Sequence, residues 1–268
     1  AGISITPLNG LTTTEAGGTA QFSVALDTLP TANVNITLAS NNLAEGSLDL
    51  SSLVFTPGNG MTPQIITISG VDDAVDDGDI AYTIMTSPAT STDVKYDSLD
   101  PNDVSVTNSD DDTAGISITP LSGLTTTEAG GTAQFSVVLD SLPLENVTLS
   151  LASDNTAEGT IDLPLLTFTT LNWNQAHTVT ISGIDDQVDD GDMNYNIVTQ
   201  PATSTDPNYS NLNPADISVS NTDDDTAGIT LVPASGLTTS ESGSSDSFEV
   251  QLDTLPTNNV TLLLSSSD

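Results

Sequence analysis

Runs in which apolar and polar residues alternate make up much of the chain, and a period of two is typical of strands that bury one face. In the first 113 residues the alternation predicts seven strands, at 2–6, 20–26, 34–39, 48–56, 65–70, 80–86 and 104–108. The residues expected to face the core are Phe22, Val24, Leu26, Val34, Ile36, Leu38, Phe55, Ile66, Ile68, Tyr82, Ile84, Val104 and Val106. No segment keeps the period of an amphipathic helix. Seven short strands in a stretch of this length predict an all-β, antiparallel, Ig-like sandwich of two sheets.

The pattern returns at a fixed interval. The segment Ala1–Pro7 reappears 113 residues later as Ala114–Pro120 and then, altered, as Ala227–Pro233. The expected core positions return as Phe135, Val137, Leu139, Val147, Leu149, Leu151, Phe168, Val179, Ile181, Tyr195, Ile197, Ile217 and Val219. A constant period of domain size indicates a tandem array. We therefore expect repeats of 113 residues at 1–113 and 114–226.

Residues 227–268 are expected to form a partial third repeat with only its first three strands. Its expected core residues are Phe248, Val250, Leu252, Val260, Leu262 and Leu264. Such a fragment would expose half a core and unpaired strand edges. Two explanations are open: the chain was cut from a longer array, or another copy completes the sandwich by strand addition.

Composition narrows the range of partners. The 268 residues include 37 acidic residues and no cysteine, and Lys95 is the only basic residue apart from one histidine, so the net charge is −36. Disulfides therefore do not stabilise the fold. Nucleic acids and anionic membrane surfaces attract basic patches, so we expect neither as a partner. No apolar run is long enough for membrane insertion, and cations are the partners that this charge favours.

The acidic residues are sorted along the chain. If each strand crosses the sandwich once, successive connections alternate between its ends, and eleven of the sixteen acidic residues of the first repeat fall at or near one end. Two unit charges about 5 Å apart repel by roughly 3 kcal/mol at an effective dielectric constant near 20, so protonation or bound cations must relieve the repulsion. Ca²⁺ fits best, because it accepts six to eight oxygen ligands in loose geometry. Zinc fits poorly, because His177 is the only nitrogen or sulfur ligand of the usual kinds. The alternative is a solvated acidic surface that keeps the protein soluble.

Three motifs recur in the same order in both full repeats. In the first they are Glu15-Ala-Gly-Gly, the stretch Val71–Tyr82 with its two Asp-Asp pairs, and Asp110-Asp-Asp-Thr-Ala-Gly-Ile116. Together they resemble the Calx-beta domain, a seven-stranded sandwich known from the calcium-sensing region of sodium–calcium exchangers and from large bacterial surface proteins. The resemblance spans each whole repeat, and the closing Asp triplet followed by Ala-Gly-Ile is its most specific part.

The resemblance implies that carboxylates hold calcium at one end of each sandwich. In the first repeat the implied ligands are Glu15, Asp72, Asp73, Asp77, Asp110, Asp111 and Asp112. In the second they are Glu128, Asp185, Asp186, Asp190, Asp223, Asp224 and Asp225. A further acidic position of the family maps onto Asp49 or Asp162. The family's acid just before the aromatic of the sixth strand is replaced by Ile80 and Met193, which implies fewer or weaker sites than in the exchanger sensor.

Repetition and resemblance together lead to a functional hypothesis. An array of like units sets a distance or multiplies a weak contact, whereas catalysis needs one site, so we expect no enzyme. The resemblance to repeats of secreted bacterial adhesins implies a location at the bacterial cell surface. The expected role is a structural spacer of an adhesin or filament, with neighbouring repeats as partners. Because only Thr113 separates the closing triplet from the next repeat, calcium there is expected to fix the angle between repeats.

Two other roles remain open. The first is an adhesion module that recognises a glycan or another cell-surface ligand, with Asn172-Trp-Asn174 as the candidate loop, because it differs between the repeats. The second is a calcium sensor that switches an attached protein, although several similar copies favour a spacer. The carboxylate pairs could also suggest a glycoside hydrolase, which uses two carboxylates. The chain lacks an aromatic platform for a sugar, however, because Trp173 is the only tryptophan and occurs in one repeat only.

Overall fold

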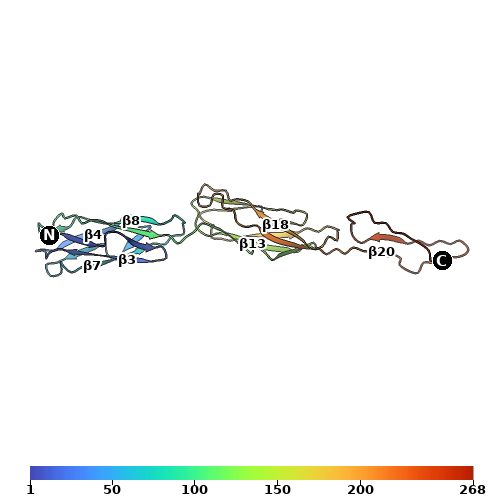
Figure 1. Ribbon diagram of the computed structural model, residues 1–268, viewed down its shortest axis with the longest axis horizontal. Helices are drawn as coiled ribbons and strands as arrows, with labels where there is room; N and C mark the ends of the chain where they lie inside the picture. Colours follow the sequence, from blue (N-terminus) through green and yellow to red (C-terminus); the bar gives the residue numbers. More distant parts are fainter. Residues whose placement is uncertain (268) are drawn as a thin grey trace. The chain divides into compact units, whose positions relative to one another are not determined.

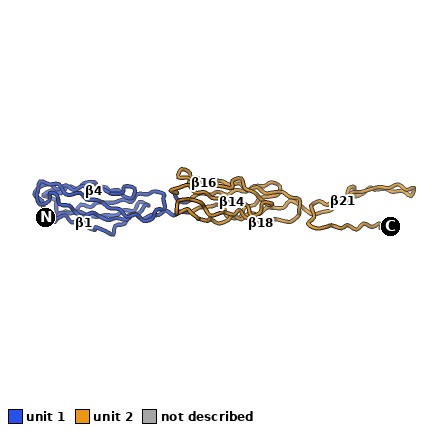
Figure 2. The backbone as a smooth tube through the Cα atoms, turned by 90° about the horizontal axis from the view of Figure 1, so that it is seen from above, with its two compact units in different colours: residues 1–114, 140–142 blue, residues 115–139, 143–268 orange. Residues whose placement is uncertain are grey.

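A computed structural model describes residues 1–267. The chain divides into two compact units (Figure 2), of which unit 1 comprises Ala1–Ala114 with Asp140–Leu142, and unit 2 comprises Gly115–Leu139 with Pro143–Asp268. Within the described residues every regular element is a β-strand. No described helix is long and apolar enough to cross a membrane. The expectation of an all-β sandwich fold is confirmed.

Unit 1 places ten strands in two sheets (Figure 1). The first sheet has the order β1-β3-β7-β5, formed by β1 (Ile3–Thr6), β3 (Thr19–Leu26), β7 (Gln64–Gly70) and β5 (Gly46–Leu48). The second sheet has the order β2-β10-β8-β4-β6, formed by β2 (Leu11–Thr14), β10 (Val104–Ser109), β8 (Ile80–Thr86), β4 (Val34–Ser40) and β6 (Ser52–Phe55). The short strand β9 (Thr90–Ser91) pairs with β4.

Unit 2 repeats this arrangement. Its first sheet has the order β11-β13-β17-β15, formed by β11 (Ile116–Thr119), β13 (Thr132–Leu139), β17 (His177–Gly183) and β15 (Gly159–Ile161). Its second sheet has the order β12-β19-β18-β14-β16, formed by β12 (Leu124–Thr127), β19 (Ile217–Thr222), β18 (Met193–Thr199), β14 (Val147–Ser153) and β16 (Leu165–Phe168). Strands β20 (Ile229–Val232) and β21 (Glu249–Leu252) form a separate antiparallel pair.

The core of each full repeat lies between its two sheets, as the alternation predicts. In β3, Phe22, Val24 and Leu26 are buried while their neighbours along the strand are not. All the core residues predicted for the two full repeats are at most 4% exposed. Burying apolar side chains on one face of each strand is the main stabilising contribution to such a sandwich, at about 1.5–3 kcal/mol for a fully buried large side chain.

Two expected strands change sheet part of the way along. The predicted strand 48–56 is divided into β5, which pairs with β7, and β6, which pairs with β4. The predicted strand 2–6 is followed after Pro7 by β2, which pairs parallel to β10 in the other sheet. The expectation of purely antiparallel pairing is therefore wrong at this pair. Strand β2 has the sequence Leu-Thr-Thr-Thr, with only one apolar residue. The alternation of apolar and polar residues therefore does not predict this strand.

The segment from 227 onward forms fewer strands than expected. Strands β20 and β21 are present, but the strand predicted at 260–264 does not form. In unit 1 the equivalent strand β4 pairs with β6, β8 and β9, and described residues 227–267 contain no counterparts of these three. Val260 and Leu262 are accordingly 49% and 43% exposed, and Phe248 is 42% exposed. These apolar side chains are therefore exposed, and the assignment of 227–268 to a partial third repeat stays a prediction.

Candidate metal centre

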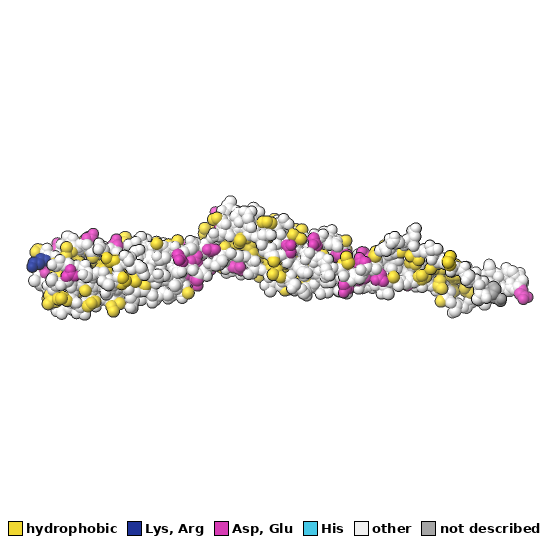
Figure 3. Space-filling model, viewed as in Figure 1, with side chains coloured by type: hydrophobic (Ala, Val, Ile, Leu, Met, Phe, Trp, Pro, Cys, Tyr) yellow, Lys and Arg dark blue, Asp and Glu magenta, His cyan; other side chains and the backbone are white. Residues whose placement is uncertain are grey.

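The acidic end of unit 1 is built by segments that enter or leave its strands. Backbone hydrogen bonds hold these segments together: Glu15 N donates to the Ser109 carbonyl oxygen at 3.0 Å, and Val71 N donates to the Glu45 carbonyl oxygen at 3.1 Å. The residue after β2, the residue before β5, the β7–β8 loop and the triplet after β10 therefore meet. In Figure 3 the acidic side chains gather in patches rather than cover the surface evenly.

Glu15 is the most buried carboxylate of this end. Its side chain is 3% exposed, and its Oε2 atom is buried without a hydrogen-bond partner. Unit 2 repeats the feature, because Glu128 is also 3% exposed and its Oε2 atom is likewise without a partner. The same is true of Asp225 Oδ2. A buried oxyanion with no donor is costly, so these atoms call for a proton or a cation.

Carboxylate oxygens converge around both glutamates. In unit 1, Glu15, Asp111 and Asp112 each offer an oxygen, and these atoms lie within 4.8 Å of one another. In unit 2 two such groups share Glu128, one with Asp185 and Asp224 and the other with Asp223 and Asp225. Calcium–oxygen distances of about 2.3–2.6 Å place ligands on opposite sides of the ion roughly 5 Å apart. The spacing and the all-oxygen donor set therefore fit Ca²⁺.

Burial and like charge raise the proton affinity of the buried glutamates. The pKa of Glu15 rises from 4.5 to about 7, first through burial and then through the charges of Asp110, Asp73 and Asp77. The pKa of Glu128 also rises to about 7, through burial and the charges of Asp223 and Asp186. Both effects disfavour the ionised form. A bound cation would oppose both of them.

Three aspartates share this environment. Burial is the first cause that raises the pKa of Asp77, followed by the charges of Glu45 and Asp73. Burial also raises the pKa of Asp112, followed by the charges of its neighbours in the triplet. The pKa of Asp225 is raised in the same way. The electrostatic field therefore extends from the closing triplet to the β7–β8 loop in unit 1 and to the β17–β18 loop in unit 2.

The β7–β8 loop, residues 71–79, is held in place by its own carboxylates and by the triplet. Gly78 has a φ of 76°, which glycine adopts without steric cost, and its N–H donates to Asp110 Oδ2 at 2.6 Å. Asp110 Oδ1 accepts from Asp112 N at 2.8 Å, and Asp73 Oδ1 accepts from Val75 N at 2.8 Å. Asp110 thus positions both the loop and the triplet.

The predicted ligands thus occupy two kinds of position. In unit 1 Asp111 and Asp112 lie beside Glu15, whereas Asp72, Asp73, Asp77 and Asp110 are linked to the cluster by charge or by hydrogen bonds. In unit 2 the residues that lie beside Glu128 are Asp185, Asp223, Asp224 and Asp225. Asp186 raises the pKa of Glu128 by its charge, and the backbone groups of Asp225, Gly191 and Asp190 lower the pKa of Asp223. Their role as metal ligands stays a prediction.

Asp49 and Asp162 do not belong to the cluster. Asp49 Oδ1 accepts from Thr67 N at 2.9 Å, and Asp162 Oδ1 accepts from Thr180 N at 2.8 Å. Each carboxylate therefore binds the backbone of the adjacent strand, β7 or β17, at a position three residues before the strand ends. The mapping of the further family acid onto them is not supported.

Glu45 and Glu158 are two buried acidic residues that are not among the ligands implied by the resemblance. Glu45 is 4% exposed, and its Oε2 atom accepts from Asn108 Nδ2 at 3.3 Å. Glu158 is 5% exposed and makes the same bond with Asn221. Each is followed by a glycine whose missing Cβ leaves room for a tyrosine, Tyr82 beside Gly46 in unit 1. The recurring Glu-Gly pair was the signal in the sequence.

Two acidic residues elsewhere in unit 1, Asp93 and Asp103, are satisfied by backbone donors. Asp93 accepts from Thr31 N at 2.8 Å and Lys95 N at 3.1 Å, and these bonds lower its pKa. Asp103 accepts from Thr86 N at 2.8 Å. These carboxylates close turns and strand ends, so they need no cation.

Comparisons with known proteins show likenesses of fold only. No protein-family model and no curated protein matches the chain. Among solved structures, the calcium-binding domain CBD12 of CALX1.1 is 16% identical, with a TM-score of 0.35, over 75% of this chain and 81% of that one. The apo form of the Calx CBD1 domain is 19% identical, with a TM-score of 0.33, over 41% and 96%. The periplasmic chaperone SfaE is 10% identical, with a TM-score of 0.33, over 81% and 99%. With TM-scores below 0.5, these likenesses carry no weight for function.

Proposed function

We propose that the chain is a non-catalytic structural spacer of an extracellular bacterial adhesin or surface filament, and that calcium stabilises its repeats. The observation that carries the calcium role is the buried, unpartnered Oε2 atom of Glu15, repeated at Glu128, beside converging aspartate oxygens. The surface location and the spacer role rest on the sequence resemblance and on the repetition.

Calcium would neutralise the converging carboxylates. Glu15 with Asp111 and Asp112 would hold the ion in unit 1. In unit 2 the ion would be held by Glu128 together with Asp185 and Asp224, or together with Asp223 and Asp225. The ion would contribute positive charge and would accept the carboxylate oxygens as ligands in a flexible geometry. A cation a hundredfold above its dissociation constant adds about 2.7 kcal/mol per site. That is a large share of the free energy of unfolding of a typical domain, which is about 5–15 kcal/mol.

Calorimetric titration tests the calcium role. The chain is first freed of metal with a chelator and then titrated with calcium. It should bind calcium at millimolar or lower concentration, because extracellular calcium-binding modules have dissociation constants of about 10⁻⁴–10⁻³ M. The variant Glu15→Gln with Glu128→Gln should lose at least tenfold in affinity, because each site loses a charged ligand.

The matched control is Asp100→Asn. Asp100 is exposed and lies outside the carboxylate groups, and the second repeat already has asparagine at the equivalent position, Asn213. This control should bind calcium like the parent. Absence of heat at 10 mM calcium, or equal affinity in the double glutamate variant, contradicts the proposal.

The alternative of a ligand-binding adhesion module finds no added support at its candidate loop. Trp173 is half-buried, and its carbonyl oxygen accepts from Leu139 N at 3.1 Å. His177 packs edge-on against Phe168 with ring centroids 4.6 Å apart. The loop therefore exposes Trp173 only in part, and the His177 ring contacts Phe168.

A further inference from the structure

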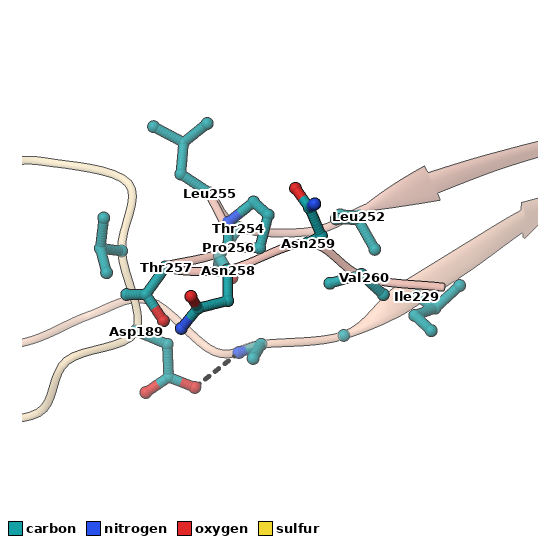
Figure 4. Close-up of a pocket in the computed structure, with 13 residues that line it drawn as sticks. Asp189, Ile229, Leu252, Thr254, Leu255, Pro256, Thr257, Asn258, Asn259 and Val260 are labelled. Atoms are coloured by element: carbon teal, nitrogen blue, oxygen red, sulfur yellow. Dashed lines mark hydrogen bonds between the residues drawn. The ribbon is translucent and has the colours of Figure 1, made fainter. Parts of the chain in front are cut away.

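A pocket of about 590 Å³ lies in unit 2, outside the candidate metal centre (Figure 4). Its lining is mostly uncharged and includes Ile229, Leu252 and Pro256. Among the described residues that line it, Asp189 is the only charged one, and its Oδ2 atom accepts from Ala227 N at 2.7 Å, drawn as the dashed line in Figure 4. The one charge in the pocket is therefore already engaged within the chain.

Asn108, in strand β10, is a buried polar residue beneath the acidic end of unit 1. Its side chain is 1% exposed and lies on the core face of the strand, in line with Val104 and Val106. Two residues further along, the chain reaches Asp110, the first residue of the closing triplet. A buried amide costs free energy unless its hydrogen bonds are made, so its partners show what it does.

The Asn108 side chain makes three hydrogen bonds. Its Nδ2 atom donates to Glu45 Oε2 at 3.3 Å and to the Val71 carbonyl oxygen at 3.1 Å. Its Oδ1 atom accepts from Thr13 Oγ1 at 2.9 Å. An asparagine side chain has two N–H donors and one acceptor oxygen, so each of these groups has a partner here.

The three partners belong to three different segments of the acidic end. Thr13 lies in β2, two residues before Glu15, and Val71 comes directly before Asp72. The third partner is itself a carboxylate, on the glutamate that precedes β5. With the triplet that follows its own strand, Asn108 therefore joins all four segments that build the acidic end.

Close packing around the amide restricts it to this arrangement. A Cβ atom at Gly70 would lie 2.6 Å from Asn108 Oδ1, so only glycine lets β7 approach so closely. On the other side, Thr13 Oγ1 and the Tyr82 hydroxyl are 3.2 Å apart and share a hydrogen bond. The missing Cβ of Gly46 leaves room for that tyrosine. The network is thus enclosed by strands of both sheets.

Unit 2 contains the same network around Asn221, which is also 1% exposed. Asn221 Oδ1 accepts from Thr126 Oγ1 at 2.9 Å. Its Nδ2 atom donates to Glu158 Oε2 at 3.3 Å and to the Ile184 carbonyl oxygen at 3.1 Å. The change from Val71 to Ile184 leaves the bond intact, because the acceptor is a backbone oxygen.

We infer that Asn108 and Asn221 are positioning residues, which hold the carboxylate-bearing segments of each acidic end together before a cation binds. These segments repel one another through their charges, and a neutral amide joins them without adding to the repulsion. Ordering the segments during folding removes part of the entropic cost that calcium binding would otherwise have to meet. The positioning role rests on the proposed calcium function and deepens it, because it names the residues on which the calcium affinity depends.

Calorimetric titration with calcium tests this role. In Asn108→Leu with Asn221→Leu each amide loses its three bonds, and the folded chain should bind calcium about tenfold more weakly. Thr13→Val with Thr126→Val removes one bond from each network and keeps the shape of the side chain, so it should weaken binding about threefold. The threonine pair covers the case in which leucine prevents folding.

The matched control is the same substitution at the far end of strands β8 and β18, Thr86→Val with Thr199→Val. Both threonines are buried, and their Oγ1 atoms donate to the carbonyl oxygens of Pro101 at 2.9 Å and Pro214 at 2.7 Å. The control should lower the melting temperature but leave the calcium affinity of the folded chain unchanged. Parent affinity in both network variants, or an equal loss in the control, overturns the inference.

Amide hydrogen exchange in chelator gives a readout that needs no calcium. The Glu15 amide is bonded to the Ser109 carbonyl oxygen and the Val71 amide to the Glu45 carbonyl oxygen. Both amides should exchange about tenfold faster in Asn108→Leu than in the parent. Strands β3 and β7 should keep their protection, which would show that the repeat is folded.

The two measurements separate the positioning role from the proposed function. If the parent takes up no calcium but these amides lose protection in the variant, the calcium role fails and the positioning role stands. If the parent binds calcium and both network variants bind it equally well, the positioning role fails and the calcium role stands. If the parent takes up no calcium and the amides keep their protection, both fail.

Discussion

Two carboxylates of similar chemistry have opposite roles according to what surrounds them. Glu15 is buried with one oxygen unpartnered, and its pKa is about 7. Asp93 is buried too, but backbone N–H groups of Thr31 and Lys95 bind it and lower its pKa. Burial without donors disfavours the ionised form, whereas backbone donors stabilise it. The same acidic composition thus provides both candidate metal ligands and turn-closing acceptors.

The raised glutamate pKa values predict a distinctive pH dependence of the metal-free chain. Glu15 and Glu128 have an ordinary pKa of 4.5 and a folded pKa of about 7, so the folded state binds their protons more tightly. Their contribution to stability is fully present below pH 4.5 and is lost as the pH rises through 7. Each contributes at most about 3 kcal/mol, at 1.36 kcal/mol per pKa unit. Thermal unfolding in chelator should therefore show a falling melting temperature between pH 4.5 and 7.

Neutral side chains provide the control for this effect. Glu15→Gln with Glu128→Gln should flatten the decline and raise the metal-free melting temperature at pH 8. Below pH 4 the lowered pKa of Asp93 acts in the other direction, so its contribution is lost as the pH falls. A decline of the same size in the double variant contradicts the assignment to these glutamates.

At the scale of elements, the connections determine the site more than the strands do. Strands β7 and β8 present the loop 71–79, but its path depends on Gly78 at a φ of 76° and on the bond from its N–H to Asp110. The parallel pairing of β2 with β10 brings Glu15 beside the residues that follow Ser109. The cluster is therefore assembled by pairing between distant segments.

Gly78→Ala tests the role of the loop. A Cβ at this φ costs roughly 1–2 kcal/mol, and the shifted N–H would weaken the bond to Asp110. The first repeat should become less stable by about that amount, as urea unfolding would measure, and calorimetry should show weaker calcium binding.

Gly58→Ala is the matched control. Gly58 has no positive φ, and an added Cβ would meet only Thr56 Oγ1 at 3.8 Å. It should leave calcium binding unchanged and stability within about 0.5 kcal/mol. Equal effects of the two alanines would argue against a special role for the loop backbone.

At the scale of the whole molecule, the acidic charge and the repetition act together. A net charge of −36 destabilises compact states by self-repulsion, and each neutralised cluster reduces this cost. Because the clusters recur at a fixed interval, divalent cations would act along the whole array rather than at one place.

Small-angle scattering tests this expectation on the intact chain. Calcium at 10 mM should increase the maximum dimension relative to chelator, because stiffer connections sample fewer bent states. It should also raise the melting temperature by roughly 5–15 °C, as expected for about 2.7 kcal/mol per repeat. Sodium chloride at equal ionic strength is the control for screening. If the maximum dimension and the melting temperature are the same in calcium and in chelator, calcium does not stiffen the chain.

The sequence by itself determined the fold class, the core and the acidic end of the fold. Phe22, Val24 and Leu26 could be placed in the core because strand periodicity is local and alternation follows burial directly. The sorting of Glu15, the 71–79 loop and the Asp110 triplet to one end followed from counting strand crossings.

Only the tertiary structure decided the details that depend on pairing between distant segments. Asp49 and Glu45 lie four residues apart, yet Asp49 accepts from the Thr67 backbone and Glu45 accepts from the Asn108 side chain. Strand β5 separates them, with Glu45 before its first residue and Asp49 after its last. Likewise, the burial of the Glu15 carboxylate depends on residues that lie far from it in the sequence. Periodicity reports which face a residue occupies, whereas desolvation and hydrogen bonding depend on which residues lie opposite.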